Sequence, residues 1–410
     1  MRKTININDG WKFLKETFNQ ITLPIKMLKD GVTINLPYAS KGVNFRGVNI
    51  SHSTKSCIYE KTIYVDAKPN EDVYIEFLGA NFLATIYANG KEVGSHSGGF
   101  STFRMNLSQY IIGHRLHLLV VVENDKNDYN GSKISACSNA FGVHRDVNLI
   151  IVQKEHFALS YFGTSGLSMV PYVNEDGSAD VSVTAISQNT NDCGVRLTLD
   201  NQVKMLDAMN ASATFHIENP TLWNGTKNPF LYTVTAELIK DGYVIDKISE
   251  SVGIRSFYVD TAAGFFLNDK PYPLNGLDES KKAKVDLLTM KNDEIENFVK
   301  SLISGGINYV TTFSHNQYFY ELCDKYGICV CGKILFLSSE IANEDEKERI
   351  VNETREIILQ NYNHPSIICW ETGNENSSKN AKEKNAETLK EVNFLCHRLD
   401  KSRLIIMNNK

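Results

Sequence analysis

The sequence lacks the features that would place it in a membrane or on nucleic acid. Nowhere do about 18 apolar residues run without interruption, so no membrane-spanning helix is expected. There is no basic tract: 43 Lys and Arg stand against 48 Asp and Glu, a net charge of -5. The start has no apolar run of signal-peptide length. We therefore expect a cytoplasmic protein whose partners are neither nucleic acid nor membrane.

Cysteine is too sparse for a disulfide scaffold, since eight residues are scattered through 410. Cys329 and Cys331 stand two apart in an apolar run, so on a strand they would share one face. No second pair at metal-ligand spacing accompanies them. Reduced thiols buried in the core are therefore predicted in preference to a zinc site.

The composition is that of a soluble globular chain, with 42% hydrophobic and 22% charged residues. At 410 residues it is too long for one ordinary core, so two or three domains are expected. Residues 1–153 show short alternating segments broken by turn signals, the clearest being the Asn89-Gly90 hairpin in "IYANGKEVG". So many short strands predict a β-sandwich of jelly-roll type.

Two further regions with their own sequence patterns follow. Residues 154–258 continue the strand pattern at immunoglobulin-domain size, which predicts a second sandwich. Residues 259–410 alternate five strand-like runs with four helical ones, which predicts a parallel sheet with helical crossovers. A closed (β/α)8 barrel takes eight of each. From the pattern alone, either the sheet is open and doubly wound or the chain stops partway round a barrel.

The motifs resemble those of glycoside hydrolase family 2, the β-galactosidases, β-glucuronidases and β-mannosidases. Six segments follow the family in order: "ATIYANGKEVGSHSGGFSTF", "FGVHRDVNLI", "ENPTLWNGTKNPFLYTVTAEL" with "VGIRSF", "GFFLNDKPYPLNGL", "SGGINYVTTFSHNQYFYELCDKYGICV" and "NYNHPSIICWETGNE". The resemblance implies a jelly-roll sugar-binding-type domain, an immunoglobulin-like sandwich and an incomplete TIM (β/α)8 barrel of about five strands. It selects the interrupted barrel over the doubly wound sheet.

The resemblance also implies the site. The family's general acid/base glutamate follows an asparagine at the end of the fourth barrel strand, which matches Glu375 and Asn374, the latter a contact for a sugar 2-hydroxyl. The nucleophile, a second glutamate after the seventh strand, has no counterpart here. Retaining hydrolysis needs two carboxyl groups about 5 to 5.5 Å apart. Glu371 is a poor substitute, since four extended residues span roughly 13 Å, and nothing in their spacing selects Asp278, Glu279 or Glu340.

Two more residues are implied as substrate-binding. His315 matches a family histidine of the sugar pocket, although a lone histidine is as often a satisfied core group. Trp370 either forms the pocket floor or fills the core, with alternation placing it opposite Glu371. Where the family has an acidic pair after the third strand this chain has Gly332 and Lys333, whose cation would alter the field in the pocket. No metal and no cofactor are expected.

The expected function is that of a retaining exo-β-glycosidase of β-galactosidase type, acting on O-glycosidic bonds of carbohydrates. The alternatives are a β-glucuronidase or β-mannosidase relative, or a degenerate carbohydrate-binding or scaffolding protein without turnover. Five parallel strands left open would expose unpaired edges. We therefore expect either a remainder of a longer polypeptide or a homo-oligomeric partner to complete the sheet.

Overall fold

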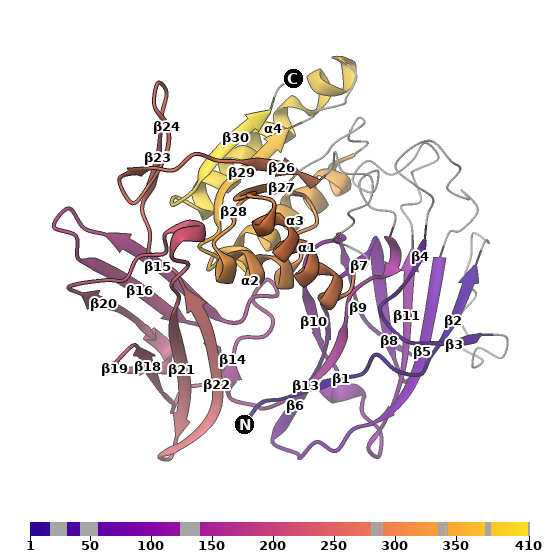
Figure 1. Ribbon diagram of the computed structural model, residues 1–410. Coiled ribbons are helices and arrows are strands. Elements are labelled where there is room, and N and C mark those ends of the chain that lie inside the picture. The colour runs from indigo at the N-terminus through magenta and orange to yellow at the C-terminus, as the bar shows by residue number, and fades with distance from the viewer. Residues whose placement is uncertain are drawn as a thin grey trace.

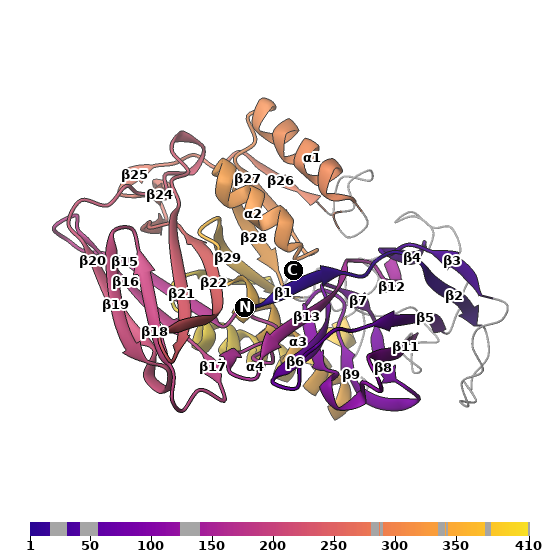
Figure 2. The same cartoon turned by 90° about the horizontal axis from the view of Figure 1, so that it is seen from below.

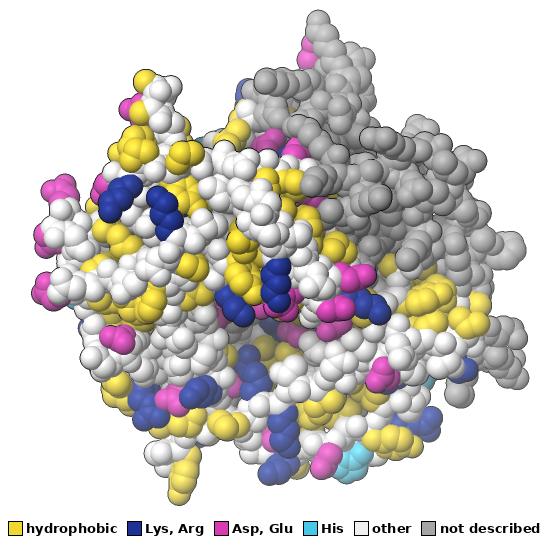
Figure 3. Space-filling view, in the orientation of Figure 1, with side chains coloured by type: hydrophobic (Ala, Val, Ile, Leu, Met, Phe, Trp, Pro, Cys, Tyr) yellow, Lys and Arg dark blue, Asp and Glu magenta, His cyan; other side chains and the backbone are white. Residues whose placement is uncertain are grey.

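The computed structural model describes the following residues: 1–16, 31–41, 56–123, 140–279, 287, 290–334, 341, 343–373 and 379–408. Two β-sandwiches lie beside each other, and a half-barrel lies across them, with the N-terminus at the junction of the sandwiches (Figures 1 and 2). Among the described helices none is long and apolar enough to cross a membrane. On the face in Figure 3 the described acidic and basic side chains are interspersed.

The first unit is the jelly-roll sandwich. Its four-stranded sheet has the order β1 (Lys3–Asn6), β13 (Val147–Gln153), β6 (Glu71–Phe77), β10 (Phe103–Asn106). The six-stranded sheet has the order β3 (Val32–Ile34), β2 (Trp11–Glu16), β5 (Ser56–Tyr64), β11 (Arg115–Glu123), β8 (Leu83–Ala88), β9 (Lys91–Ser97). A small sheet orders β4 (Tyr38–Lys41), β12 (Ala140–Val143), β7 (Ala80–Asn81). Asn89 and Gly90, with φ of 47° and 81°, join β8 to β9 as predicted.

The second unit is the immunoglobulin-like sandwich. One sheet has the order β15 (Leu167–Val173), β16 (Ala179–Ala185), β20 (Ser212–Ile217). The other has the order β19 (Gln202–Asp207), β18 (Gly194–Leu199), β21 (Tyr232–Lys240), β22 (Tyr243–Val252). A short pair joins β14 (His156–Phe157) to β17 (Ser187–Gln188). In β16 the apolar residues are buried at every second position, so the core lies between the sheets.

The third unit is half of a barrel. A short antiparallel sheet of β23 (Phe257–Asp260), β24 (Gly264–Leu267) and β25 (Lys270–Pro271) precedes it. The parallel sheet has the order β26 (Gly276–Asp278), β27 (Tyr309–Thr312), β28 (Cys329–Lys333), β29 (Ile367–Gly373), β30 (Leu404–Asn408). The crossover helices are α1 (Asn292–Ser304), α2 (Gln317–Tyr326), α3 (Glu344–Asn361) and α4 (Lys379–Leu399). The predicted five parallel strands and four helices are all present among the described residues of this unit.

The helices distinguish a barrel from a doubly wound sheet. Buried residues of all four pack in one cluster with Val310, Val330 and Trp370, so they cover one face of the sheet. The other face carries a separate cluster that includes Cys329 and Cys331. Helices on a single face are the arrangement of a (β/α)8 barrel. Within the described residues β26 and β30 are the two edges of the sheet.

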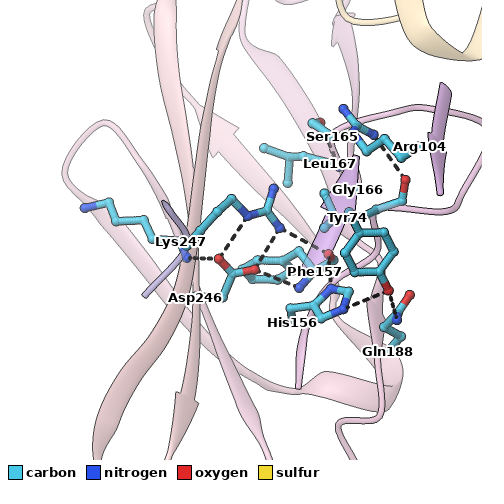
Figure 4. A network of polar contacts seen from close by, with 12 residues as sticks. Tyr74, Arg104, His156, Phe157, Ser165, Gly166, Leu167, Gln188, Asp246 and Lys247 are labelled. Atoms are coloured by element: carbon cyan, nitrogen blue, oxygen red, sulfur yellow. Dashed lines mark hydrogen bonds and ion pairs between the residues drawn. The ribbon is translucent and has the colours of Figure 1, made fainter. Parts of the chain in front are cut away.

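The two sandwiches are joined by a buried ion pair (Figure 4). Arg2 donates from Nε and Nη2 to the two carboxylate oxygens of Asp246, at 3.2 and 2.8 Å, and from Nη2 to the carbonyl oxygen of Phe157. Asp246 also accepts from the Phe157 amide at 2.9 Å and is fully buried. This network fixes the N-terminus to the second unit across the junction.

A neutral histidine continues the same junction (Figure 4). His156 is fully buried, and burial lowers its pKa. Its Nδ1 lies 2.8 Å from the carbonyl oxygen of Phe157, so this nitrogen carries the hydrogen, and Nε2 accepts from the Tyr74 hydroxyl at 3.3 Å. Gln188 donates to the same hydroxyl at 3.0 Å. Both sandwiches thus contribute to one satisfied buried network.

The second unit is also fixed to the half-barrel. The indole of Trp223 donates to the carbonyl oxygen of Asp324 in α2 at 2.9 Å. Asn363, in the loop before β29, accepts from the Met169 amide at 3.0 Å and donates to the Leu167 carbonyl at 2.8 Å. These contacts hold the amino end of β29 against strand β15.

Helix α3 binds the first unit through polar side chains on one face. Glu356 accepts from the Ser101 hydroxyl at 2.6 Å and pairs with His96 at 2.9 Å. Gln360 both accepts from the Thr102 amide, at 2.9 Å, and donates to its carbonyl oxygen, at 2.8 Å. The segment that carries these partners belongs to a motif that resembles the family's sugar-binding domain, so part of that motif serves domain docking.

Glu353, one turn earlier on α3, predicts a pH-dependent stability. Its carboxylate accepts from the Gly99 amide at 2.8 Å, and burial raises the pKa of Glu353 to about 7. The folded protein then holds a proton that the unfolded chain has lost between pH 4.5 and about 7. The free energy of unfolding should therefore fall, by about 3 kcal/mol, as the pH rises through this window.

Glu353→Gln should remove this component, since glutamine keeps the acceptor for Gly99 without the charge. Urea unfolding at pH 5 and pH 8 measures it, with Glu348→Gln, an exposed residue of the same helix, as the control. We expect Glu353→Gln to be more stable than the unsubstituted chain at pH 8. An equal loss of stability between pH 5 and pH 8 in both variants would show that Glu353 is not the titrating group.

Candidate active site

The carboxyl ends of β26–β30 meet at one rim of the half-barrel, where barrel enzymes place their reacting groups. An ion pair lies here. The Lys333 ammonium is 3.3 Å from an Asp278 carboxylate oxygen, with side chains 4% and 19% exposed. Alternation places Lys333 on the face of β28 that carries Cys329 and Cys331, away from the helices. The rim therefore holds a buried cation facing the inside of the half-barrel.

Glu279, which follows β26, is held as an acceptor. It is 2% exposed, and the hydroxyl of Thr312 at the end of β27 donates to it. The Leu287 amide donates to its other oxygen at 3.3 Å, and the Thr312 hydroxyl also lies 3.0 Å from that of Ser314. Through these bonds Glu279 links the ends of β26 and β27 at the rim.

His315 follows β27 in a left-handed conformation, with φ of 44° and a ring that is 1% exposed. Its Nε2 lies 2.8 Å from the carbonyl oxygen of Lys333, which can only accept, so Nε2 carries the hydrogen. Nδ1 then accepts from the Tyr320 hydroxyl at 2.8 Å. Burial lowers the pKa of His315 to about 4, so the ring is neutral at pH 7. Both nitrogens bind protein groups here, and contact with a sugar stays a prediction.

Arg145 connects the first unit to this rim and was missed in the sequence. It lies in "FGVHRDVNLI" and donates to the carbonyl oxygens of Ser314, Phe100 and Leu78 at 2.5, 3.0 and 3.2 Å. Burial lowers the pKa of Arg145 to about 10, which still leaves it charged at pH 7. Phe100 meets the His315 ring edge to face, with centroids 5.9 Å apart. The jelly roll therefore positions the loop after β27.

Trp370 lies in the core on the helix side of β29. It is fully buried and its indole donates to the Asp400 carboxylate at 2.8 Å. Glu371 is partly exposed on the opposite face, as alternation predicts. The packing is that of the core alternative, and a contact between Trp370 and substrate stays a prediction.

Asn374 and Glu375 lie outside the described residues. They follow Gly373, the last residue of β29, directly in the chain. Glu340, also considered as a strand-end acid, lies outside them as well. The described residues therefore show the surroundings of Asn374 and Glu375 and not these two side chains themselves.

The thiols are buried, as predicted, at the seven described positions: Cys57, Cys193, Cys323, Cys329, Cys331, Cys369 and Cys396. Cys137 lies outside the described residues. A hydrogen bond with Cys369, together with burial, raises the pKa of Cys331. Groups of three His, Cys, Asp or Glu able to hold a metal ion are not found in the part of the chain that the structure describes.

Two β-sandwiches followed by barrel strands are the domain arrangement of glycosyl hydrolases family 2, and the chain belongs to that family. The sugar-binding domain of that family matches residues 2–152. A second family 2 domain matches residues 165–255, and its TIM barrel domain matches residues 259–410. The resemblance found in the sequence is thereby confirmed, together with the fold class it implied.

Curated relatives are longer than this chain. It is 28% identical to a putative β-glucuronidase of Formosa agariphila, over 97% of this chain and 50% of the relative. It is 26% identical to a β-glucuronidase of Bacteroides fragilis, over 98% and 60%. A β-galactosidase of Thermoanaerobacter pseudethanolicus is 25% identical, over 98% and 55%. The chain thus spans 50 to 60% of the length of these relatives.

A solved structure has the same fold over almost the whole of this chain. The FMN-binding β-glucuronidase from Facaelibacterium prausnitzii L2-6 matches with a TM-score of 0.87 and 26% identity, over 99% of this chain and 64% of that one. The comparisons establish that the chain belongs to glycosyl hydrolases family 2. They include both β-glucuronidases and β-galactosidases, so the β-galactosidase type expected from the sequence is not confirmed.

Proposed function

We propose that this chain supplies the acid/base half of a retaining exo-β-glycosidase whose barrel is completed by further polypeptide. The observation that supports this most is the open five-stranded sheet, with Asn374 and Glu375 following its fourth strand. In the proposed mechanism Glu375 protonates the leaving oxygen and then deprotonates water. Asn374 holds the sugar 2-hydroxyl. A carboxylate from outside these 410 residues, about 5 to 5.5 Å from the Glu375 carboxyl group, attacks the anomeric carbon.

The charge at the rim favours a substrate whose sugar carries a negative charge. Lys333 presents an ammonium on the inner face, and Asp278 orients it from one side at 3.3 Å. A carboxylate on the sugar would be attracted to such a poorly solvated cation. Together with the names of several relatives, this favours β-glucuronides, with β-galactosides as the alternative.

Substrate preference tests the sugar. The ratio of kcat/KM for 4-nitrophenyl β-D-glucuronide over the β-D-galactoside should exceed one in the completed protein. Lys333→Met should lower this ratio by about tenfold, because one charged hydrogen bond to the uronate is lost. Lys347→Met on α3 is the control. A ratio below one, unaffected by Lys333→Met, would identify the galactoside as the substrate.

A carbohydrate-binding role without turnover is the second candidate. It is favoured by the rim carboxylates that the structure describes, since Asp278 pairs with Lys333 and Glu279 accepts from Thr312 and Leu287. Neither is placed as an unengaged nucleophile. Saturable binding of glucuronate or galactose without hydrolysis, in a protein with a complete barrel, would establish this candidate over the enzyme.

The open sheet predicts association of the isolated chain. Ile406 and Met407 on the edge strand β30 are 44% and 38% exposed, and edge strands with apolar side chains pair with other chains. Light scattering should give a mass well above 46.1 kDa for the chain alone. Ile406→Lys should reduce the association, whereas Tyr64→Lys, exposed on the interior strand β5 of the first unit, should not. A dispersed monomer would show that the edge is protected.

A further inference from the structure

A cavity of about 270 Å³ lies at the end of the half-barrel opposite to the rim. Edge strand β15 forms one wall, through residues 169–173, and the connecting segment 253–257 forms another. The loops that precede β29 and β30, at residues 362–365 and 401–403, close it. Because these loops lead into the amino ends of the strands, the cavity is separate from the candidate active site.

The lining is cationic. It includes Arg255, Lys401 and Arg403, and no Asp or Glu is among the described residues that line it. Arg403 is already satisfied: it pairs with Asp400 at 2.8 Å and donates to the carbonyl oxygens of Tyr362, His364 and Ile367. Neither Arg255 nor Lys401 forms an ion pair with a carboxylate in the described parts of the chain.

Arg255 is the group that points to a ligand. It donates from Nε to the Pro365 carbonyl at 2.5 Å and from Nη2 to the Ile367 carbonyl at 2.6 Å. Nη1 has no partner among the residues that the structure describes. Burial, and then the like charge of Arg403, lower the pKa of Arg255 to about 9, so it is still a cation at pH 7. Arg255 is partly buried, so its charge is only partly solvated, and an anion in the cavity would be attracted to it.

We propose that this cavity binds a small oxyanion, a phosphate or carboxylate group, with Arg255 at its base and Lys401 at its mouth. The fixed guanidinium offers the donor geometry that such groups accept. Phe257, whose ring lies 4.7 Å from the Arg255 guanidinium carbon, fixes the plane of that group. Tyr172, 64% exposed, extends the wall toward solvent. The site serves binding and is independent of the proposed hydrolysis.

Calorimetric titration of the whole chain tests the site, with inorganic phosphate and citrate as probes and sodium chloride keeping the ionic strength constant. Saturable binding of one ion per chain is expected. Lys401→Glu should weaken it about tenfold, since attraction is replaced by repulsion at the mouth. Lys91→Glu on the β8–β9 hairpin carries the same charge change far from the cavity and should leave the affinity unchanged. Both lysines are exposed, so neither change should disturb folding.

The two probes separate the sources of the oxyanion. Binding of phosphate alone supports a phosphoryl ligand, and binding of citrate alone supports a carboxylate ligand. Arg255→Lys, which keeps the charge but loses the planar fork, should weaken whichever ion binds. Absence of saturable binding by both ions would overturn the proposal. Equal weakening by Lys401→Glu and Lys91→Glu would overturn it too, because net charge alone would then account for the effect.

Discussion

Replacing Glu375 by glutamine in the completed barrel should lower kcat for phenyl β-glycosides by about 10²- to 10⁴-fold. Glutamine keeps the size of the side chain but cannot donate the proton that the leaving oxygen needs. The chain should fold as before, and KM should change little. Steady-state hydrolysis measures the loss. Glu387→Gln, exposed on α4, is the control and should keep full activity.

The leaving group separates an acid/base role from a nucleophilic one. A dinitrophenolate departs without a proton, so the first step on a dinitrophenyl glycoside should survive Glu375→Gln far better than on a phenyl glycoside. A nucleophile would be needed equally for both. An equal loss of the first step with the two substrates would therefore contradict the assignment of Glu375 as the acid.

Asp400→Ala should cost about 3 to 5 kcal/mol of unfolding free energy, because it leaves a buried cation and a buried indole donor unpaired. Asp400 is fully buried and accepts from the Trp370 indole and from Arg403, each at 2.8 Å. It also accepts from the Ser402 amide at 3.0 Å. Since Arg403 holds the loop before β29, we expect the strand that leads to Glu375 to lose its anchor as well.

Denaturant unfolding measures this loss, with Asp192→Ala in an exposed loop as the control. The loss of unfolding free energy in Asp400→Asn should lie between those of Asp400→Ala and the control, since asparagine keeps an acceptor but not the charge. Burial opposes ionisation of Asp400, but Arg403 and the hydrogen bonds outweigh it and lower its pKa. The carboxylate's contribution should thus be present above the unfolded pKa and disappear as pH falls through the folded one. A cost near that of the control would mean that Arg403 is held by its carbonyl partners alone.

The strands and helices were predictable because each follows a local rule. Alternating apolar residues specify β16, and the Asn89-Gly90 turn specifies the hairpin of β8 and β9. The five parallel strands were recognisable as apolar runs between amphipathic segments. Periodicity could not decide between a half-barrel and a doubly wound sheet, because both contain the same elements. That choice depends on which face the helices cover, which is a property of the packing.

The surroundings of the site were less predictable. The Arg145 bond to Ser314 joins residues 169 apart, and the Lys333 bond to Asp278 joins residues 55 apart. No local pattern encodes such pairs. A strand-end histidine has the same sequence context whether its nitrogens face a ligand or, as in His315, the protein. Asn374 and Glu375 came from the family resemblance, since the residues alone favour a helix-capping or solvated glutamate over a general acid.

The most direct measurement is the rate at which the isolated 410-residue chain hydrolyses dinitrophenyl β-glucuronide and β-galactoside. If one carboxylate of the reaction lies in this chain and the other outside it, the rate should not exceed that of buffer, even though these substrates need no acid. Turnover by the isolated chain that Glu375→Gln alters would contradict this division, because the nucleophile would then have to be among these residues.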